Sequence, residues 1–163
     1  MQRSLVGSEM CIRDRLYDVI LEKAVSYGIG IVSNERIDEI NILQATYEAM
    51  REALSQLSPH AEYILADAVT IPRISTPQRG IVKGDAKSMS IGAASIVAKV
   101  YRDRLMAELA QKYPYYGFEK NAGYGTAAHI AGLKQYGVTP QHRKSYKPIQ
   151  AFMTEKGSAD IDD

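Results

Sequence analysis

The sequence contains one cysteine, Cys11, among its 163 residues. A single thiol excludes a framework of disulfides within the chain and is typical of proteins from a reducing compartment. No apolar run approaches the roughly 20 residues that span a bilayer. The N-terminus also lacks the long apolar region and small-residue cleavage site of a secretory signal. We therefore expect a cytoplasmic protein that makes no membrane contact.

The sequence also lacks the motifs of several enzyme classes. It has no cluster of cysteine and histidine with the spacing of a zinc site, no P-loop and no dinucleotide-binding glycine pattern. Ser95 lies in no nucleophile-elbow pattern, although composition alone does not exclude a Ser-His-Asp triad. The length allows one domain with a hydrophobic core, and the apolar fraction of 45% is ordinary for a soluble globular protein.

The net charge is +1, but the charges are distributed unevenly. Residues 73–147 contain 13 Lys/Arg and 4 Asp/Glu, a balance of +9, which leaves 7 basic and 15 acidic residues elsewhere, a balance of −8. A basic block of this kind indicates a polyanionic partner such as nucleic acid. A solvated charged surface is the alternative.

Residues 1–15 differ from the rest of the chain because they show no sustained helix or strand period. The stretch from Ser4 to Arg15 is similar to a translated sequencing-adaptor read-through. We expect residues 1–15 to be a foreign segment and exclude them from fold reasoning. A genuine disordered N-terminus is the alternative.

The remaining residues alternate between helical and strand patterns, which predicts an α/β layered fold. Helices are expected at 16–27, 34–57, 90–113 and 126–136, and strands at 28–33, 63–67 and 81–83. The strand at 63–67 is expected to be buried on both faces because its apolar run is continuous. Three strands are few for a covered sheet, and a missing N-terminal sheet would explain that. Residues 152–163 are expected to form a disordered acidic tail.

Two aspartates follow predicted strands. Asp67 closes the apolar run at 63–66, and Asp85 follows residues 81–84. Ligand sites of α/β sheets gather beyond the carboxyl ends of strands, and carboxylates suit Mg²⁺ or Mn²⁺. Two ligands are too few for a two-metal site. A turn cap or a solvated sheet edge is the alternative for each aspartate.

An aromatic residue and a basic loop are further candidates for contact with nucleic acid. Tyr124 lies between two glycines, so its ring could stack on a sugar or base. A turn tyrosine that packs on its own helix is the alternative. Residues 142–146 could bind phosphates through Arg143, Lys144 and the Ser145 hydroxyl, or form a solvated loop.

Together, these segments resemble the ribonuclease HII family of bacterial endonucleases, which cut RNA in RNA–DNA hybrids. The resemblance covers residues 16–151 and depends on several segments in the family's order. The segments are Ile37-Asp38-Glu39-Ile40-Asn41-Ile42-Leu43, Tyr63-Ile64-Leu65-Ala66-Asp67, Lys83-Gly84-Asp85-Ala86-Lys87, Ala93-Ala94-Ser95-Ile96-Val97-Ala98-Lys99-Val100 with Arg102-Asp103, Tyr116-Gly117-Phe118, Gly123-Tyr124-Gly125-Thr126 and His142-Arg143-Lys144-Ser145-Tyr146.

The resemblance implies an RNase H-like fold and two-metal catalysis with Mg²⁺ or Mn²⁺ that leaves a 5′-phosphate. Asp67 and Asp85 match the third and fourth of four catalytic carboxylates, and Tyr124 matches the tyrosine that senses the RNA–DNA junction. The family's first carboxylate pair and glycine-rich loop match nothing here. We therefore expect an incomplete sheet and a fragment without hydrolytic activity. The residues expected to contact nucleic acid are Lys83, Ser95, Lys99, Tyr124, His142, Arg143, Lys144 and Ser145.

The implied partners are an RNA–DNA hybrid or DNA with embedded ribonucleotides, bound by a monomer. A contact with a sliding clamp is an option that no residue pattern supports. One alternative function is a non-catalytic nucleic-acid-binding module, for which the basic block and Tyr124 would suffice. Another is a different RNase H-like nuclease, such as a junction resolvase.

Overall fold

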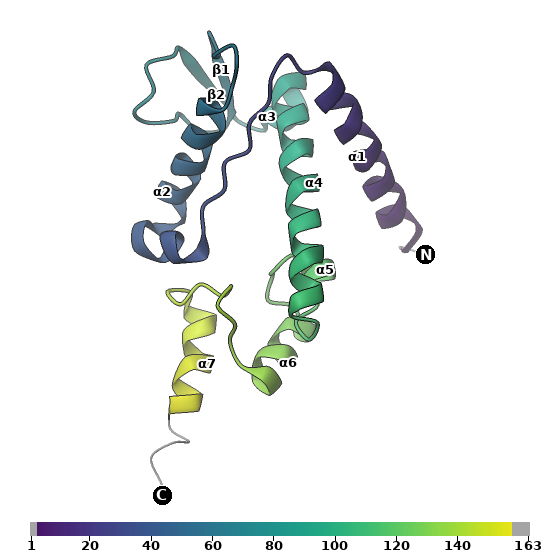
Figure 1. Cartoon of the computed structure of the whole chain (residues 1–163), viewed down its shortest axis with the longest axis vertical. Coiled ribbons are helices and arrows are strands. Elements are labelled where there is room, and N and C mark those ends of the chain that lie inside the picture. Colours follow the sequence, from purple (N-terminus) through teal and green to yellow (C-terminus); the bar gives the residue numbers. More distant parts are fainter. Residues whose placement is uncertain (1–2, 158–163) are drawn as a thin grey trace, which may run out of the picture. The chain divides into compact units, whose positions relative to one another are not determined.

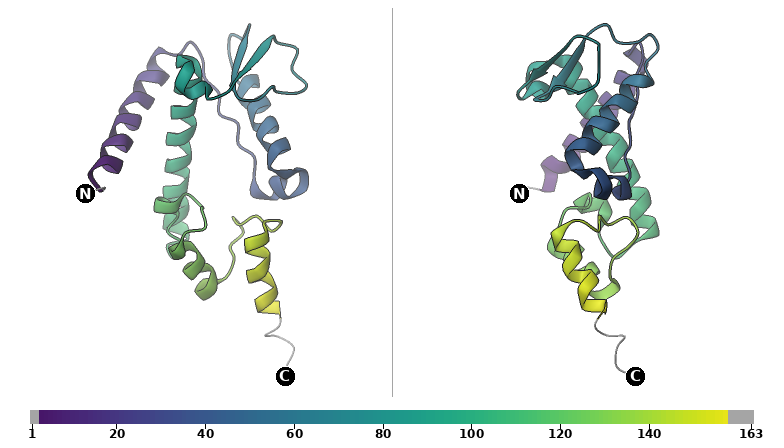
Figure 2. Two further views of the ribbon diagram at one scale, coloured as in Figure 1. Left: turned by 180° about the vertical axis from the view of Figure 1, so that it is seen from behind. Right: turned by 90° about the vertical axis from the view of Figure 1, so that its left-hand side faces the viewer.

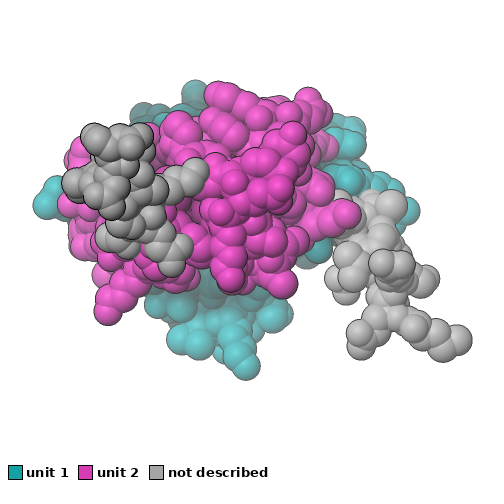
Figure 3. All heavy atoms as spheres, turned by 90° about the horizontal axis from the view of Figure 1, so that it is seen from below, with its two compact units in different colours: residues 1–31, 46–101 teal, residues 32–45, 102–163 magenta. Residues whose placement is uncertain are grey.

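The computed structural model describes residues 3–157 (Figure 1). These residues form two compact units, 1–31 with 46–101 and 32–45 with 102–163, which Figure 3 colours separately. The elements are α1 (Arg3–Lys23), α2 (Asn34–Ser55), β1 (Ile64–Asp67), β2 (Gln78–Ile81), α3 (Gly84–Lys87), α4 (Met89–Lys112), α5 (Phe118–Asn121), α6 (Ala127–Tyr136) and α7 (Lys147–Gly157). The expected single domain therefore has two parts, and both α2 and α4 contribute to each of them.

The first unit contains a two-stranded parallel sheet in which Asp67, the last residue of β1, pairs with Ile81 of β2. The prediction that β1 is buried on both faces is wrong. Its burial alternates, and Leu65 is 39% exposed. Alternation of this kind is typical of a strand that is covered on one face.

The strand predicted at 28–33 is not formed, and this segment instead lies against α2. Ideal Cβ atoms on Gly28 and Gly30 would lie 2.2 and 1.8 Å from the carbonyl oxygens of Ala53 and Ala49. The side-chain amide of Gln56 replaces a neighbouring strand, since it bonds both the N–H and the carbonyl of Ile29. The two glycines therefore permit a contact between backbones that any side chain would prevent.

Helix α1 packs beside α4 in the first unit (Figures 1 and 2). Tyr17 of α1 joins Val97 and Val100 of α4 in one buried cluster. The expected helix at 16–27 begins earlier, at Arg3, and ends earlier, at Lys23. Residues 3–15, expected to be irregular, are therefore helical, and residues 1–2 lie outside the described part.

Helix α2 is two helical segments joined at Asn41, whose backbone is non-helical (φ 67°, ψ 164°). Ser33 Oγ accepts a hydrogen bond from the Arg36 N–H and so caps the start of the first segment. Asn41 Oδ1 accepts the N–H groups of Leu43 and Gln44 and so begins the second segment. One predicted helix therefore contains an internal cap.

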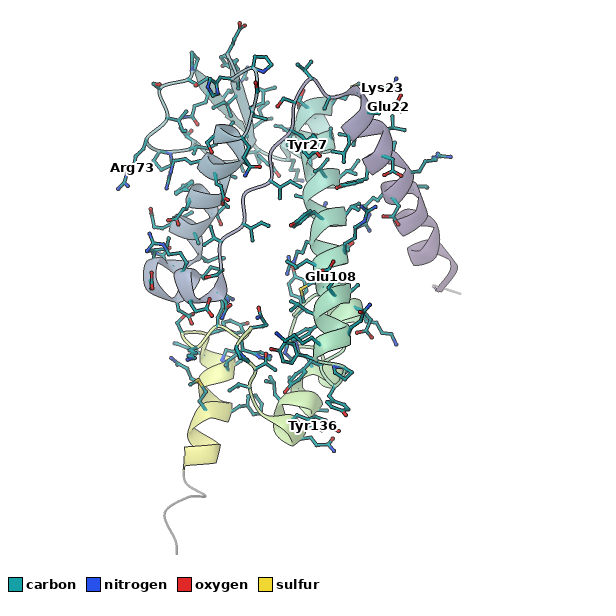
Figure 4. All side chains as sticks on the ribbon, viewed as in Figure 1. Glu22, Lys23, Tyr27, Arg73, Glu108 and Tyr136 are labelled. Carbon is teal, nitrogen blue, oxygen red and sulfur yellow. The ribbon has the colours of Figure 1, made fainter. Side chains whose placement is uncertain are left out.

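The second unit is built around a buried cluster in which α6 and α7 meet the segment after α4. Helix α6 has the predicted ends, because Thr126 Oγ1 accepts the His129 N–H and Gly137 follows the last turn with a φ of 77°. Tyr136, near the end of α6 in Figure 4, stacks on Tyr115 with 3.9 Å between ring centroids. The core residues of this cluster are Tyr116, Phe118, Leu133 and Ile149.

Helix α7 corrects the expectation of a disordered tail at 152–163. Residues 152–157 lie in this helix, and Phe152 packs against the core cluster of the second unit. The core of the second unit therefore includes a residue of the predicted tail. Residues 158–163 of the predicted tail lie outside the described residues.

Candidate functional site

The carboxylate of Asp67 is tied to the chain segment that carries Asp85. Asp67 Oδ1 accepts a hydrogen bond of 2.8 Å from the N–H of Gly84, the first residue of α3. Asp85 is the next residue, so its Cα lies about 3.8 Å from that of Gly84. Both aspartates are exposed. The turn-cap alternative for Asp67 therefore holds for one of its oxygens, and the same contact brings the segment of Asp85 to the end of β1.

Asp85 lies farther from its strand than expected. Strand β2 ends at Ile81, and Asp85 falls in the first turn of the short helix α3. Lys83 forms the turn between them with a φ of 55°, and its side chain is exposed. The predicted strand at 81–83 is therefore wrong beyond its first residue, because the left-handed backbone at Lys83 ends any extended run.

Helix α4 places two more candidates in the same unit. A Cβ on Gly92 would lie 3.0 Å from the carbonyl oxygen of Asp85, so the first turns of α4 approach the α3 backbone closely. Ser95 and Lys99 follow Gly92 by three and seven residues, which places all three on one helix face. Ser95 is half-buried and Lys99 is exposed. Asp67, Asp85, Ser95 and Lys99 therefore all belong to the first unit, together with Lys83.

The donor set fits a hard divalent cation only in part. Carboxylate oxygens at a strand end are suitable ligands for Mg²⁺ or Mn²⁺. Among the residues that the structure describes, no group of three or more His, Cys, Asp or Glu side chains could hold a metal ion. Asp67 and Asp85 are therefore residues that could contribute to a metal site but do not constitute one.

Tyr124 belongs to the second unit and is 69% exposed. The Tyr124 N–H donates to the carbonyl of Asn121, and the Tyr124 carbonyl accepts the N–H of Thr126, both at 2.8 Å. The guanidinium of Arg102 lies 5.6 Å from the ring centroid, and Arg102 also donates to the Ala122 carbonyl. A ring that is exposed while its backbone is fixed can stack on a base or sugar.

His142 was expected to contact nucleic acid, but the structure buries it. The side chain is 7% exposed and accepts the N–H of Thr139 at its Nδ1 atom. Its Nε2 atom lies 3.0 Å from Nε2 of His129, which is also buried. Burial lowers the pKa of both imidazoles, and the nearby His129 lowers the pKa of His142 further. His142 is therefore a neutral core residue and is not a phosphate ligand here.

The loop that follows His142 is organised by Asp38. The Asp38 carboxylate accepts the backbone N–H groups of Lys144 and Ser145 and the Ser145 hydroxyl. These bonds, of which the Ser145 hydroxyl bond is the largest influence, hold the pKa of Asp38 below its usual value against a smaller opposing effect of burial. The Ser145 hydroxyl is thus engaged within the protein, which corrects its predicted role. The side chains of Arg143 and Lys144 remain for phosphate, and Arg143 lies over the ring of Tyr146 at 4.9 Å.

The sequence patterns indicate no role for His129 or Arg102, and Asp38 is notable in the sequence only as part of a family segment. Two features of the sequence could have drawn attention to His129. The chain has only three histidines in all. His129 also follows the capping Thr126 by three residues, the position whose backbone N–H donates to the capping side chain.

A sequence profile of the ribonuclease HII family matches residues 3–149. The chain belongs to the ribonuclease HII family. It is 56% identical over 142 residues to the ribonuclease HII of Pediococcus pentosaceus, a match that covers 87% of this chain and 55% of the relative. It is 60% identical over 134 residues to that of Lachnoclostridium phytofermentans, covering 82% and 53%. The chain thus spans about half the length of these ribonuclease HII relatives.

The fold agrees with that of a solved relative. The crystal structure of the ribonuclease H2 from Pyrococcus horikoshii OT3 superimposes with a TM-score of 0.75 at 25% identity, covering 90% of this chain and 77% of that one. The predicted α/β fold of the RNase H-like class is therefore confirmed. Within residues 3–157, no helix has the length and apolarity needed to cross a membrane.

Proposed function

We propose that this chain carries part of the active site of an endonuclease that hydrolyses the RNA strand of RNA–DNA hybrids, including ribonucleotides embedded in DNA. The supporting observation is the hydrogen bond between Asp67 and Gly84, which joins the segment that carries Asp85 to the end of β1, and both carboxylates are exposed. Membership of the ribonuclease HII family supports the same reaction. The products would carry a 5′-phosphate, and the protein would act as a monomer.

Asp67 and Asp85 would hold Mg²⁺ or Mn²⁺, which when bound activates water and stabilises the leaving 3′-oxygen. Ser95 and Lys99 would contact the phosphate backbone from one face of α4, and Lys83 from the turn before α3. In the second unit, the Tyr124 ring would stack at the RNA–DNA junction. Arg143 and Lys144 would bind phosphates, so affinity should fall as salt concentration rises.

Two carboxylates repel each other without a cation and are too few for a pair of metal ions. The 163-residue chain alone would therefore bind duplexes without cleaving them. We assign no contact with a sliding clamp.

A chimera tests this proposal. Residues 16–163 are joined behind the part of the Pediococcus pentosaceus ribonuclease HII that precedes the matched region. We expect the chimera to cleave a duplex with a single ribonucleotide and to leave an all-DNA duplex and a four-way junction intact. Cleavage of the junction alone would favour a resolvase, and binding without any cleavage would favour a non-catalytic module.

A further inference from the structure

A pair of buried histidines supports the backbone of Tyr124. His129, from α6, is 4% exposed, and His142, from the following loop, is 7% exposed. Their Nε2 atoms lie 3.0 Å apart, and His129 Nδ1 lies 3.1 Å from the carbonyl oxygen of Tyr124. The proposed function uses neither imidazole directly.

The hydrogen bonds fix where each proton lies. The Thr139 N–H donates to His142 Nδ1 at 2.9 Å, so this nitrogen is an acceptor and the neutral ring carries its proton on Nε2. His142 Nε2–H then donates to His129 Nε2, which leaves the His129 proton on Nδ1. His129 Nδ1–H therefore donates to the Tyr124 carbonyl. The tautomers follow from the network, since each ring has one donor and one acceptor.

The chain of hydrogen bonds ends at Tyr124, which is 69% exposed. The Tyr124 carbonyl accepts both His129 Nδ1–H and the Thr126 N–H, while the Tyr124 N–H donates to Asn121. Both sides of the residue are thus fixed, although it lies between Gly123, with a φ of 83°, and Gly125, whose surroundings are open within 4 Å. Flexible neighbours would otherwise leave the direction of the ring undefined.

We propose that His129 and His142 are positioning residues that hold Tyr124 through one directed chain of hydrogen bonds, so that its exposed ring meets nucleic acid in a single orientation. The assignment rests on the proposed function for the use of the ring. The hydrogen-bond chain itself can be tested without nucleic acid.

The surroundings of the two histidines allow this chain of hydrogen bonds only while both imidazoles are neutral. The rings of Tyr116 and Phe118 and the hydroxyl of Thr139 contact the pair. Of these, Tyr116 is titratable, and it stays neutral because burial raises its pKa. In the described part of the chain, neither histidine forms an ion pair. A proton added to either ring would place two N–H groups against each other and break the chain.

A double-mutant cycle tests the link between the pair and the ring. The affinity of the 163-residue chain for a duplex with one ribonucleotide is measured for His129→Leu, Tyr124→Ala and both together. Since stacking of one base changes affinity about 5- to 150-fold, we expect a loss in this range for Tyr124→Ala and a smaller one for His129→Leu. In the Tyr124→Ala background, His129→Leu should have less than a twofold effect. Tyr116→Phe is the matched control, because it removes a buried bond to Gly137 without touching Tyr124.

The outcomes separate the inference from the proposed function. If His129→Leu has the same effect in both backgrounds, its role is purely structural and the inference is overturned. If Tyr124→Ala leaves affinity unchanged, the proposed role of the ring fails. The inference is then decided by the NMR experiment that follows.

Imidazole ¹⁵N shifts should report a proton on Nδ1 of His129 and on Nε2 of His142. His142→Leu should shift the Tyr124 amide and ring resonances, and His142→Gln, which keeps a donor near the Nε2 position, should restore them. Lowering the pH should shift the same Tyr124 resonances in the wild type through protonation of either histidine, and in His142→Gln through protonation of His129 alone. The opposite tautomers, or Tyr124 resonances that ignore His142→Leu, would overturn the inference.

Discussion

Asp67 Oδ1 and the Gly84 N–H form a hydrogen bond of 2.8 Å that joins the end of β1 to the start of α3. This bond gives Asp67 a structural role in addition to the proposed metal role. The two roles can be separated by substitution, because the neutral side-chain amide of asparagine can accept the same hydrogen bond but is a poor metal ligand.

Substitutions at Asp67 should therefore separate stability from metal binding. We expect Asp67→Asn to unfold near the wild-type urea midpoint, since its amide oxygen still accepts the Gly84 N–H. Asp67→Ala should lose about 1 kcal/mol of unfolding free energy, as is typical of a lost cap. Binding of Mn²⁺ to the chimera, followed by the electron paramagnetic resonance of the ion, should weaken in both variants. Unchanged Mn²⁺ binding in Asp67→Asn would remove Asp67 from the ligand set.

Gly30 should tolerate no side chain. A Cβ there would lie 1.8 Å from the carbonyl oxygen of Ala49, a backbone atom that cannot move aside without shifting α2. We expect Gly30→Ala to lower the free energy of unfolding by about 1–3 kcal/mol or more, as overpacked sites do. Gly125→Ala is the matched control, because nothing lies within 4 Å of its Cβ position. Equal midpoints for the two variants in urea would show that residues 28–31 do not pack on α2.

The histidine pair predicts the direction of the pH dependence. The pKa values of His129 and His142 are lowered from 6.5, so the unfolded chain takes up protons first as the pH falls. Their contribution to stability is complete above pH 6.5 and is lost as the pH falls below 6.5 toward the lowered values. The slope can reach about 1.4 kcal/mol per pH unit for each histidine. Thermal unfolding followed by circular dichroism should show a shallower slope for His142→Gln, and an identical slope would contradict the neutral pair.

Asp38 should stabilise the loop at 143–145 more than a surface carboxylate does. Asp38→Ala would leave the Lys144 and Ser145 N–H groups without their acceptor, and we expect a lower thermal midpoint and faster proteolysis at this loop. Glu39→Ala is the matched control, because Glu39 is exposed and forms an ion pair with Arg36 along the helix. Because the pKa of Asp38 is held below 3.8, its contribution should persist above pH 3.8 and be lost as the pH falls further. Equal protease sensitivity of the two variants would argue against a stabilising role of Asp38 in this loop.

The sequence predicted most reliably those features that depend on neighbouring residues. The helix predicted at 126–136 agrees with α6, whose ends are set by the caps Thr126 and Gly137, because caps act within one turn. The strand at 28–33 was wrong because an extended run becomes a strand only beside a partner. Here, the Gln56 side chain, 27 residues from Ile29, and the α2 backbone take that place.

In the candidate site, too, the features that depend on nearby residues were predicted and those that depend on distant residues were not. Asp67 was predicted at a strand end from its local apolar run, and the structure confirms that position. The burial of His142 could not be predicted, because its immediate neighbours are polar and its partner His129 lies 13 residues earlier. The engagement of Ser145 by Asp38 spans 107 residues, a distance that no local pattern reports.

The most direct test of the account is the cleavage rate of the Asp67→Asn chimera on a duplex that contains one ribonucleotide, in Mg²⁺ and in Mn²⁺. Loss of a residue that merely supports a metal ligand costs about 10- to 100-fold, so loss of a ligand should reduce cleavage by more than about 100-fold, with duplex affinity retained. Glu62→Gln, a change at an exposed carboxylate just before β1, should cleave at the rate of the unaltered chimera. Cleavage by Asp67→Asn at the control rate would contradict the central claim that this strand end carries the catalytic carboxylates.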